Sequence, residues 1–170
     1  MSDFFKTKSQ FYLPKGIIYL DGNSLGPLPK KTQDRIQHTL NNEWGEMLVT
    51  GWNKAGWMDQ PNEVGDRIAK LIGATSKTVT VGDTLSIKVF QALASATNYQ
   101  KHRKVLLTDS SNFPSDIYAA QGLVNMLQND YQVKIVSTDD LIDNINENVA
   151  AVFFTEVDYK TGHRYDAKKV

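Results

Sequence analysis

The sequence contains no cysteine, which excludes thiol nucleophiles, thiolate metal sites and any disulfide framework. Charge of neither sign is in excess, because 19 Lys and Arg residues balance 19 Asp and Glu residues among 170. This balance argues against a nucleic-acid partner, since nucleic-acid-binding proteins usually carry a basic face. No apolar run approaches the roughly 20 residues of a membrane span, and the N-terminus lacks the regions of a signal peptide. The composition predicts a soluble intracellular protein without a membrane partner.

Patterns that mark common catalytic sites are also scarce. The sequence has no Gly-x-Ser-x-Gly nucleophile motif and neither of the usual glycine-rich phosphate loops. The histidines are widely separated, which indicates surface or structural positions rather than a metal site: His38, His102 and His163. Function must therefore be sought in the loops that connect the predicted elements.

The first part of the chain is irregular and then helical. Residues 21–27 form a turn-rich run, and Pro29 stands where the first turn of a helix tolerates proline. Apolar residues then recur every four positions, as in one face of a helix: Ile36, Leu40, Trp44 and Leu48. A second helix is predicted over residues 62–72, with Gly73 at its C-terminal cap.

The rest of the chain alternates between strands and helices. Strands are predicted over residues 78–81, 105–107, 133–136 and 149–154, and helices over 85–96, 117–127 and 141–145. This alternation predicts an α/β fold with a mostly parallel sheet flanked by helices. Because the chain stops soon after the last predicted strand, we expect the sheet to be incomplete and the chain to be part of a larger α/β protein.

Ligands in open α/β sheets bind beyond the carboxyl ends of the strands, which directs attention to the loop at residues 82–86. There Thr84 and Ser86 place hydroxyl groups beside the free backbone N–H groups of a helix N-terminus, an arrangement suited to an anion. The alternative is that Asp83 or Thr84 only caps the helix, and spacing alone favours capping.

A second loop of this kind spans residues 112–116 and holds Phe113, Pro114, Ser115 and Asp116 after Asn112. Pro114 restricts Phe113 to extended geometry, so its ring can be presented over the strand ends. An aromatic ring beside a carboxylate suits a flat cationic ring, whose nitrogen the carboxylate would keep protonated. Capping of the helix by Ser115 or Asp116 explains the same residues equally well. The third loop, over residues 155–162, is interpreted as solvated.

Two tryptophans, Trp52 and Trp57, occupy a short loop bounded by glycines at residues 51–57. They either anchor the loop to the core or form the wall of an aromatic substrate pocket. The sequence alone favours anchoring.

Several segments in the same order together resemble the kynureninase family. The most specific pair is Asn-Ser-Leu-Gly at residues 23–26 and Phe-Pro-Ser-Asp at residues 113–116. The resemblance continues at residues 19–27, 51–57, 65–69, 71–74, 83–86 and 159–162. It implies a pyridoxal 5′-phosphate enzyme of the aspartate-aminotransferase fold type that acts as a cytoplasmic homodimer. The implied reaction hydrolyses L-kynurenine, or its 3-hydroxy form, to anthranilate or 3-hydroxyanthranilate and L-alanine, in tryptophan catabolism and NAD biosynthesis.

The resemblance also implies roles for individual residues. Residues of the phosphate-binding turn and of the ring-binding motif match the cofactor site of the family: Thr84, Leu85, Ser86, Phe113, Pro114, Ser115 and Asp116. Within that set, Phe113 matches the aromatic residue that stacks on the cofactor ring, and Asp116 the carboxylate near the pyridine nitrogen. Asn23, Ser24 and Trp52 match positions of the substrate pocket. By this resemblance, residues 1–60 are an N-terminal arm, turn and helix, and residues 61–170 begin a truncated cofactor-binding domain.

One departure from the family is large. Its Schiff-base lysine follows a tyrosine and lies downstream of the matched segments, and neither Lys88 nor Lys160 matches it. We therefore predict no catalytic residue in this chain and no activity for the chain alone. The alternatives are another enzyme of the same fold type, such as a cysteine desulfurase or a class V aminotransferase, and a non-catalytic truncated α/β module.

Overall fold

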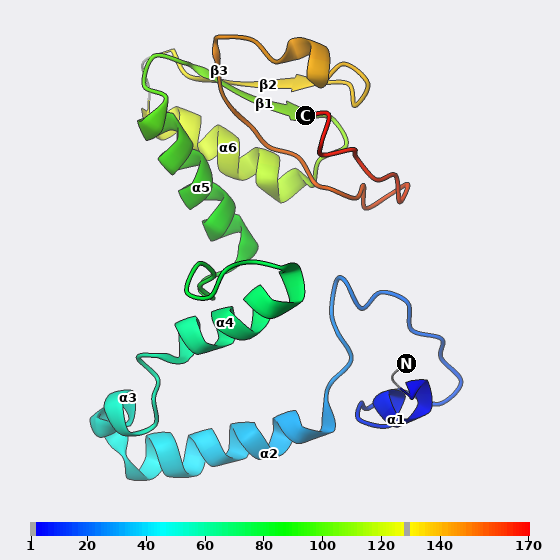
Figure 1. Ribbon diagram of the computed structural model, residues 1–170, viewed down its shortest axis with the longest axis vertical. Helices are drawn as coiled ribbons and strands as arrows, with labels where there is room; N and C mark the ends of the chain where they lie inside the picture. The colour runs from blue at the N-terminus through cyan, green and yellow to red at the C-terminus, as the bar shows by residue number, and fades with distance from the viewer. Residues whose placement is uncertain (1–2, 128–129) are drawn as a thin grey trace. The chain divides into compact units, whose positions relative to one another are not determined.

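The computed structural model describes residues 3–127 and 130–170 (Figure 1). The chain divides into two compact units, of which the first ends at Val81 and the second begins at Gly82. The predicted organisation into an arm and a truncated domain, with its boundary at residue 60, stays a prediction.

The first unit, in its described part, combines helices with an irregular segment over residues 9–29. Its helices are α1 (Phe4–Lys8), α2 (Lys30–His38), the π-helix η1 (Thr39–Glu46), the 3₁₀-helix η2 (Leu48–Thr50), α3 (Gly51–Lys54) and α4 (Gln60–Ile72). Pro29 directly precedes α2 with extended backbone, which agrees with its predicted place at a helix start.

The predicted helix with apolar residues at every fourth position is confirmed through α2 and η1. The structure corrects its end, because Leu48 has a φ of 49° and lies beyond the π-helix. The side chains of Ile36, Leu40 and Trp44 remain 45–63% exposed. Periodicity thus identified the helix, but these apolar residues are not packed into a core within this unit.

Helix α4 confirms the prediction over residues 62–72, and Gly73 ends it in the left-handed region with a φ of 73°. The strand predicted over residues 78–81 is wrong. This segment is extended but bonds to α4 instead of a strand: the Val81 N–H donates to the Pro61 carbonyl, 3.1 Å away, and Thr80 Oγ1 donates to Asn62 Oδ1. Residues 78–81 therefore have the alternating pattern of a strand but form hydrogen bonds with a helix.

The second unit is an α/β layer. It comprises α5 (Leu85–Tyr99), β1 (Val105–Asp109), α6 (Pro114–Leu127), β2 (Gln132–Val136), the 3₁₀-helix η3 (Ile142–Asn144) and β3 (Val149–Val152). The strands form a parallel sheet in the order β2-β1-β3, which confirms the predicted fold class. The predicted helices and strands after residue 84 are confirmed, except that the element predicted over 141–145 is a single 3₁₀ turn and β3 is shorter than predicted.

The central strand β1 is buried on both faces, as expected for a parallel sheet. On one face Leu106 packs with Leu93 of α5 and with Ala120 and Leu123 of α6. On the other face, residues of β1 and β3 pack with the loops after the strands: Val105, Leu107, Val149, Leu141 and Tyr165. Because α5, α6 and this second cluster pack against both faces of β1, its carboxyl end is rigidly positioned and so is the start of the loop that follows.

Close packing within the first unit gives a prediction for Gly65. A Cβ atom at this position of α4 would lie 2.7 Å from the Val79 carbonyl carbon and would collide with its oxygen. Gly65→Ala is therefore expected to lower the free energy of unfolding by about 2 kcal/mol, because overpacking outweighs the gain in helix propensity. Urea unfolding followed by tryptophan fluorescence measures this, since Trp44, Trp52 and Trp57 all lie in the first unit.

The matched control is Gly122→Ala in α6, where an added Cβ meets no atom within 4 Å. That substitution should raise the stability of the second unit by up to about 1 kcal/mol through helix propensity alone, measured by circular dichroism because all three tryptophans lie in the first unit. Equal effects of the two substitutions would contradict the assigned contact between α4 and residue 79.

Candidate functional site

The N-terminus of α5 is open. Thr84 precedes the helix with extended backbone, and no described side chain caps it. Asp83 is instead 3.7 Å from the Lys88 Nζ as an ion pair, so the capping interpretation that spacing favoured is wrong for this helix. Leu85 is 68% exposed and Ser86 is exposed as well. The first-turn N–H groups and the hydroxyls of Thr84 and Ser86 can therefore receive an anion.

The loop before α6 presents an aromatic ring next to a buried carboxylate. The Phe113 ring is 45% exposed, and its contact is an edge-on approach to Tyr159 with centroids 4.9 Å apart. Pro114 begins α6, and Asp116 in its first turn is buried. The Asp116 Oδ1 accepts a hydrogen bond of 3.3 Å from the hydroxyl of Ser115. Neither side chain caps α6 by a hydrogen bond that the described residues show, which leaves the carboxylate available to a ligand.

A narrow polar cavity lies beyond the carboxyl ends of β1 and β3. Its lining residues are Asp109, Ser111, Asn112, Thr155, Asp158 and Tyr165, and it leaves no room for a water molecule. The Oδ2 of Asp109 and the hydroxyl of Tyr165 are buried without a hydrogen-bond partner among the described residues. Burial raises the pKa of Tyr165, and the nearby Asp109 charge adds to this. Backbone N–H groups of Thr161 and Lys160 lower the pKa of Asp158.

Two residues to which the sequence analysis gave no role, although they lie in the second and third loops, connect this cavity to Phe113. Asn112 bonds to the backbone of Phe113, and Thr155 bonds to Asn112 across 43 residues of sequence. The only sequence signal was a polar residue before a Phe-Pro pair and after a strand, which is equally typical of an ordinary turn.

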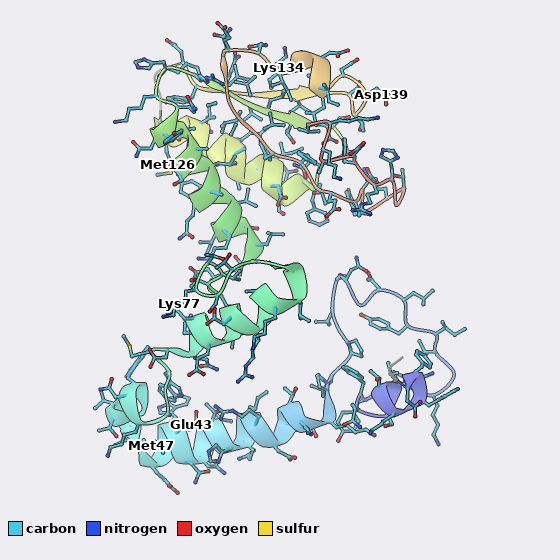
Figure 2. All side chains as sticks on the ribbon, viewed as in Figure 1. Glu43, Met47, Lys77, Met126, Lys134 and Asp139 are labelled. Atoms are coloured by element: carbon cyan, nitrogen blue, oxygen red, sulfur yellow. The ribbon has the colours of Figure 1, made fainter. Side chains whose placement is uncertain are left out.

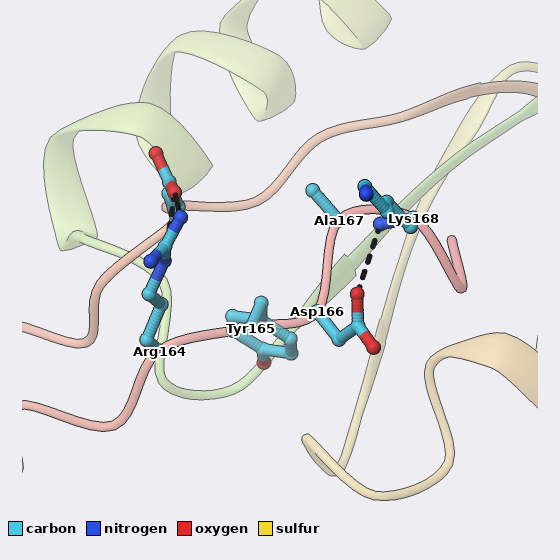
Figure 3. A pocket seen from close by; sticks show the side chains of 6 residues that line it. Arg164, Tyr165, Asp166, Ala167 and Lys168 are labelled. Carbon is cyan, nitrogen blue, oxygen red and sulfur yellow. Dashed lines mark hydrogen bonds and ion pairs between the residues drawn. The ribbon is translucent and has the colours of Figure 1, made fainter.

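A larger hollow of about 570 Å³ lies over the C-terminal loop and contains none of the predicted site residues (Figure 3). Three of the four charged residues that line it have partners: Arg164 pairs with Glu156 at 2.8 Å, and Asp166 accepts the backbone N–H of Lys168. We therefore assign this hollow to the folding of the loop and place the candidate site at α5 and α6.

The predicted substrate-pocket residues belong to the first unit. Asn23 and Ser24 lie in an exposed turn, whereas Trp52 lies in α3 with half of its surface exposed. The turn precedes α2 and α3 follows η1, so the 17 helical residues of α2 and η1 lie between them in the sequence. The assignment of these residues to one substrate pocket stays a prediction.

Trp57 anchors its loop, as the sequence favoured. Its Nε1 donates to Glu43 Oε2 at 2.9 Å, and its ring meets Trp52 edge-on at 5.8 Å. Glu43 lies in η1, where Figure 2 labels it. It is only 5% exposed and also accepts from Arg35 Nη1 at 2.6 Å. The Arg35 hydrogen bond, followed by that of Trp57, holds the pKa of Glu43 below its usual value.

This lowered pKa gives a prediction for acid stability. A carboxylate whose pKa is lower when folded stabilises above its unfolded pKa, about 4.3, and loses that contribution as the pH falls through the folded value. Glu43→Gln should therefore reduce the urea midpoint of the first unit at pH 7, and the difference from wild type should shrink below about pH 4. Glu46→Gln, which removes the same charge from an exposed position, is the control. A constant difference at every pH would contradict this account.

Residues 3–127 and 130–170 contain no group of three or more acidic or histidine side chains suited to a metal ion. Among the helices that the structure describes, none has the length and apolar character needed to cross a membrane.

Comparison with known proteins supplies independent information, although no family model matches the chain. The kynureninase of Burkholderia mallei (strain SAVP1) is 43% identical over 168 residues, which are 96% of this chain and 40% of that protein. The kynureninase of Pseudomonas fluorescens is 44% identical over 164 residues, 94% of this chain and 39% of that protein. The chain thus spans about two fifths of the length of these relatives. Along nearly all of its own length, this chain is similar to the kynureninases.

Proposed function

We propose that this chain is the part of a kynureninase that holds pyridoxal 5′-phosphate for the hydrolysis of L-kynurenine to anthranilate and L-alanine. The observation that carries the proposal is the identity of 43% to a kynureninase over 96% of the chain. The cytoplasmic location and the homodimeric state that the resemblance implies belong to the same proposal.

The described residues fit this cofactor. Its phosphate suits the uncapped N-terminus of α5, where Thr84, Leu85 and Ser86 provide backbone N–H groups and hydroxyls. Its pyridine ring suits the half-exposed ring of Phe113. Its ring nitrogen suits the buried carboxylate of Asp116, which has one long hydrogen bond from Ser115.

Each residue then has a definite task. The α5 N-terminus binds the phosphate and fixes one end of the cofactor, while Phe113 excludes water from one face of the ring. The Asp116 carboxylate accepts a hydrogen bond from the ring N–H and keeps that nitrogen protonated. When bound, a protonated pyridine ring withdraws electrons from the carbon at which the substrate reacts. Trp52, whose exposed indole can contact an aryl group, is proposed for the substrate side.

The test is a fluorescence titration of the 170-residue chain with pyridoxamine 5′-phosphate. This compound carries the ring and phosphate of the cofactor but no aldehyde, so it binds without a lysine. We expect saturable binding, and much weaker binding of pyridoxamine, which lacks the phosphate. Equal binding of the two compounds, or none, would refute the proposed cofactor site.

The same preparation should release no anthranilate from L-kynurenine and pyridoxal 5′-phosphate. Neither Lys88 nor Lys160 matches the position of the family's covalent lysine, and the reaction requires that amine. Anthranilate release, followed by its fluorescence, would show that another lysine of this chain replaces it.

A further inference from the structure

Asn112 is a buried amide that joins three segments of the second unit. It is 4% exposed and lies between the end of β1 and the start of α6. Its Nδ2 donates to Thr108 Oγ1 at 2.9 Å. Its Oδ1 accepts from Thr155 Oγ1 at 2.7 Å and from the Phe113 N–H at 2.8 Å. A backbone N–H can only donate, so the bond from Phe113 fixes which end of the amide is the oxygen.

These bonds act on the backbone that carries the Phe113 ring. Pro114 already restricts Phe113 to extended backbone geometry, and Asn112 fixes the direction of its N–H. The ring of Tyr159 then packs against it in a T-shaped arrangement, with centroids 4.9 Å apart. The ring is 45% exposed, so part of its surface remains free for a ligand although its backbone is fixed.

We propose that Asn112 is a positioning residue, which sets the Phe113 ring at the angle needed to stack on a flat, phosphorylated pyridine ring. The inference rests on the proposed function, because it takes that ligand class from it. Asn112 does not touch the ligand. It acts through the backbone of Phe113, and its bonds to Thr108 and Thr155 tie that backbone to the ends of β1 and of the segment after β3.

The test compares ring binding with phosphate binding in Asn112→Ala. We expect the dissociation constant of pyridoxamine 5′-phosphate to rise about tenfold, since the ring loses its preset orientation. Inorganic phosphate, measured as a competitor, should keep its inhibition constant because it uses only the N-terminus of α5. A general loss of folding would weaken both ligands, so the ratio of the two constants isolates the positioning role.

Thr108 provides a matched pair of variants. Thr108→Ser keeps the hydroxyl that accepts from Asn112 and should bind pyridoxamine 5′-phosphate as wild type does. Thr108→Val removes that acceptor with little change of volume, and we expect binding several-fold weaker.

The outcomes separate the two proposals. If the wild-type chain fails to bind pyridoxamine 5′-phosphate, the proposed function is wrong and the inference falls with it. If the wild type binds and Asn112→Ala binds equally well, or loses both ligands in parallel, the positioning role alone is overturned.

Discussion

Asp116→Asn is expected to weaken the binding of pyridoxamine 5′-phosphate by about 10- to 100-fold. The substitution keeps the shape of the side chain and an oxygen that can accept from the Ser115 hydroxyl, 3.3 Å from the Asp116 Oδ1. It removes the charge that a protonated ring nitrogen requires. A hydrogen bond to a charged group contributes about 1.5–3 kcal/mol, and each 1.4 kcal/mol is tenfold in affinity. The fluorescence titration measures the change.

Burial makes this effect large. Asp116 is 9% exposed, so water neither competes well for the carboxylate nor screens its charge. The control is Asp143→Asn, which removes the same charge from an exposed position in η3 of the same unit. If both variants lose affinity equally, long-range charge explains the loss and Asp116 has no specific role.

The sequence predicted the second unit well because the local pattern of each element agrees with its packing in the fold. Strand β1 is a short, strongly apolar run, and α5 and α6 carry apolar residues at helical spacing on the faces that cover it. The parallel order then follows from the alternation of strand and helix. The same alternation located the loop before α6 at the carboxyl end of β1. It also located the loop before α5, although residues 78–81 do not form the strand predicted before that loop.

The errors arose where a segment with a typical local pattern makes tertiary contacts that the pattern does not predict. Residues 78–81 alternate like a strand, but their polar groups bond to Pro61 and Asn62 of a helix. Thr84 is a typical capping residue, yet it does not cap α5. Both outcomes depend on contacts that composition and spacing do not contain.

Buried polar contacts could not be predicted from the sequence either. Glu43 looks like any charged residue of a surface helix until Arg35 and Trp57 are seen to share its carboxylate. The amide of Asn112 is satisfied by residues 4 and 43 positions away. Such partners are identified only once the chain is folded, since no periodicity connects them.

Phe113→Ala is the second substitution with a large expected effect. Loss of an aromatic face that stacks on a heterocyclic ring costs about 1–3 kcal/mol by alanine substitution, so the affinity for pyridoxamine 5′-phosphate should fall about 5- to 100-fold. The bond to Asn112 Oδ1 is donated by the backbone N–H of Phe113, so alanine can retain it and the loop can keep its conformation. Inorganic phosphate should bind this variant as it binds the wild type.

Two further variants separate stacking from other causes. Phe113→Tyr keeps the ring and should restore most of the affinity, whereas Tyr118→Ala removes an aromatic ring that is 69% exposed on α6 and should have no effect. If Phe113→Ala binds the probe as tightly as Tyr118→Ala, the ring does not stack on the cofactor. In that case the anion site at α5 and the carboxylate of Asp116 would have to hold the cofactor without it, and the role of Asn112 would lose its basis as well.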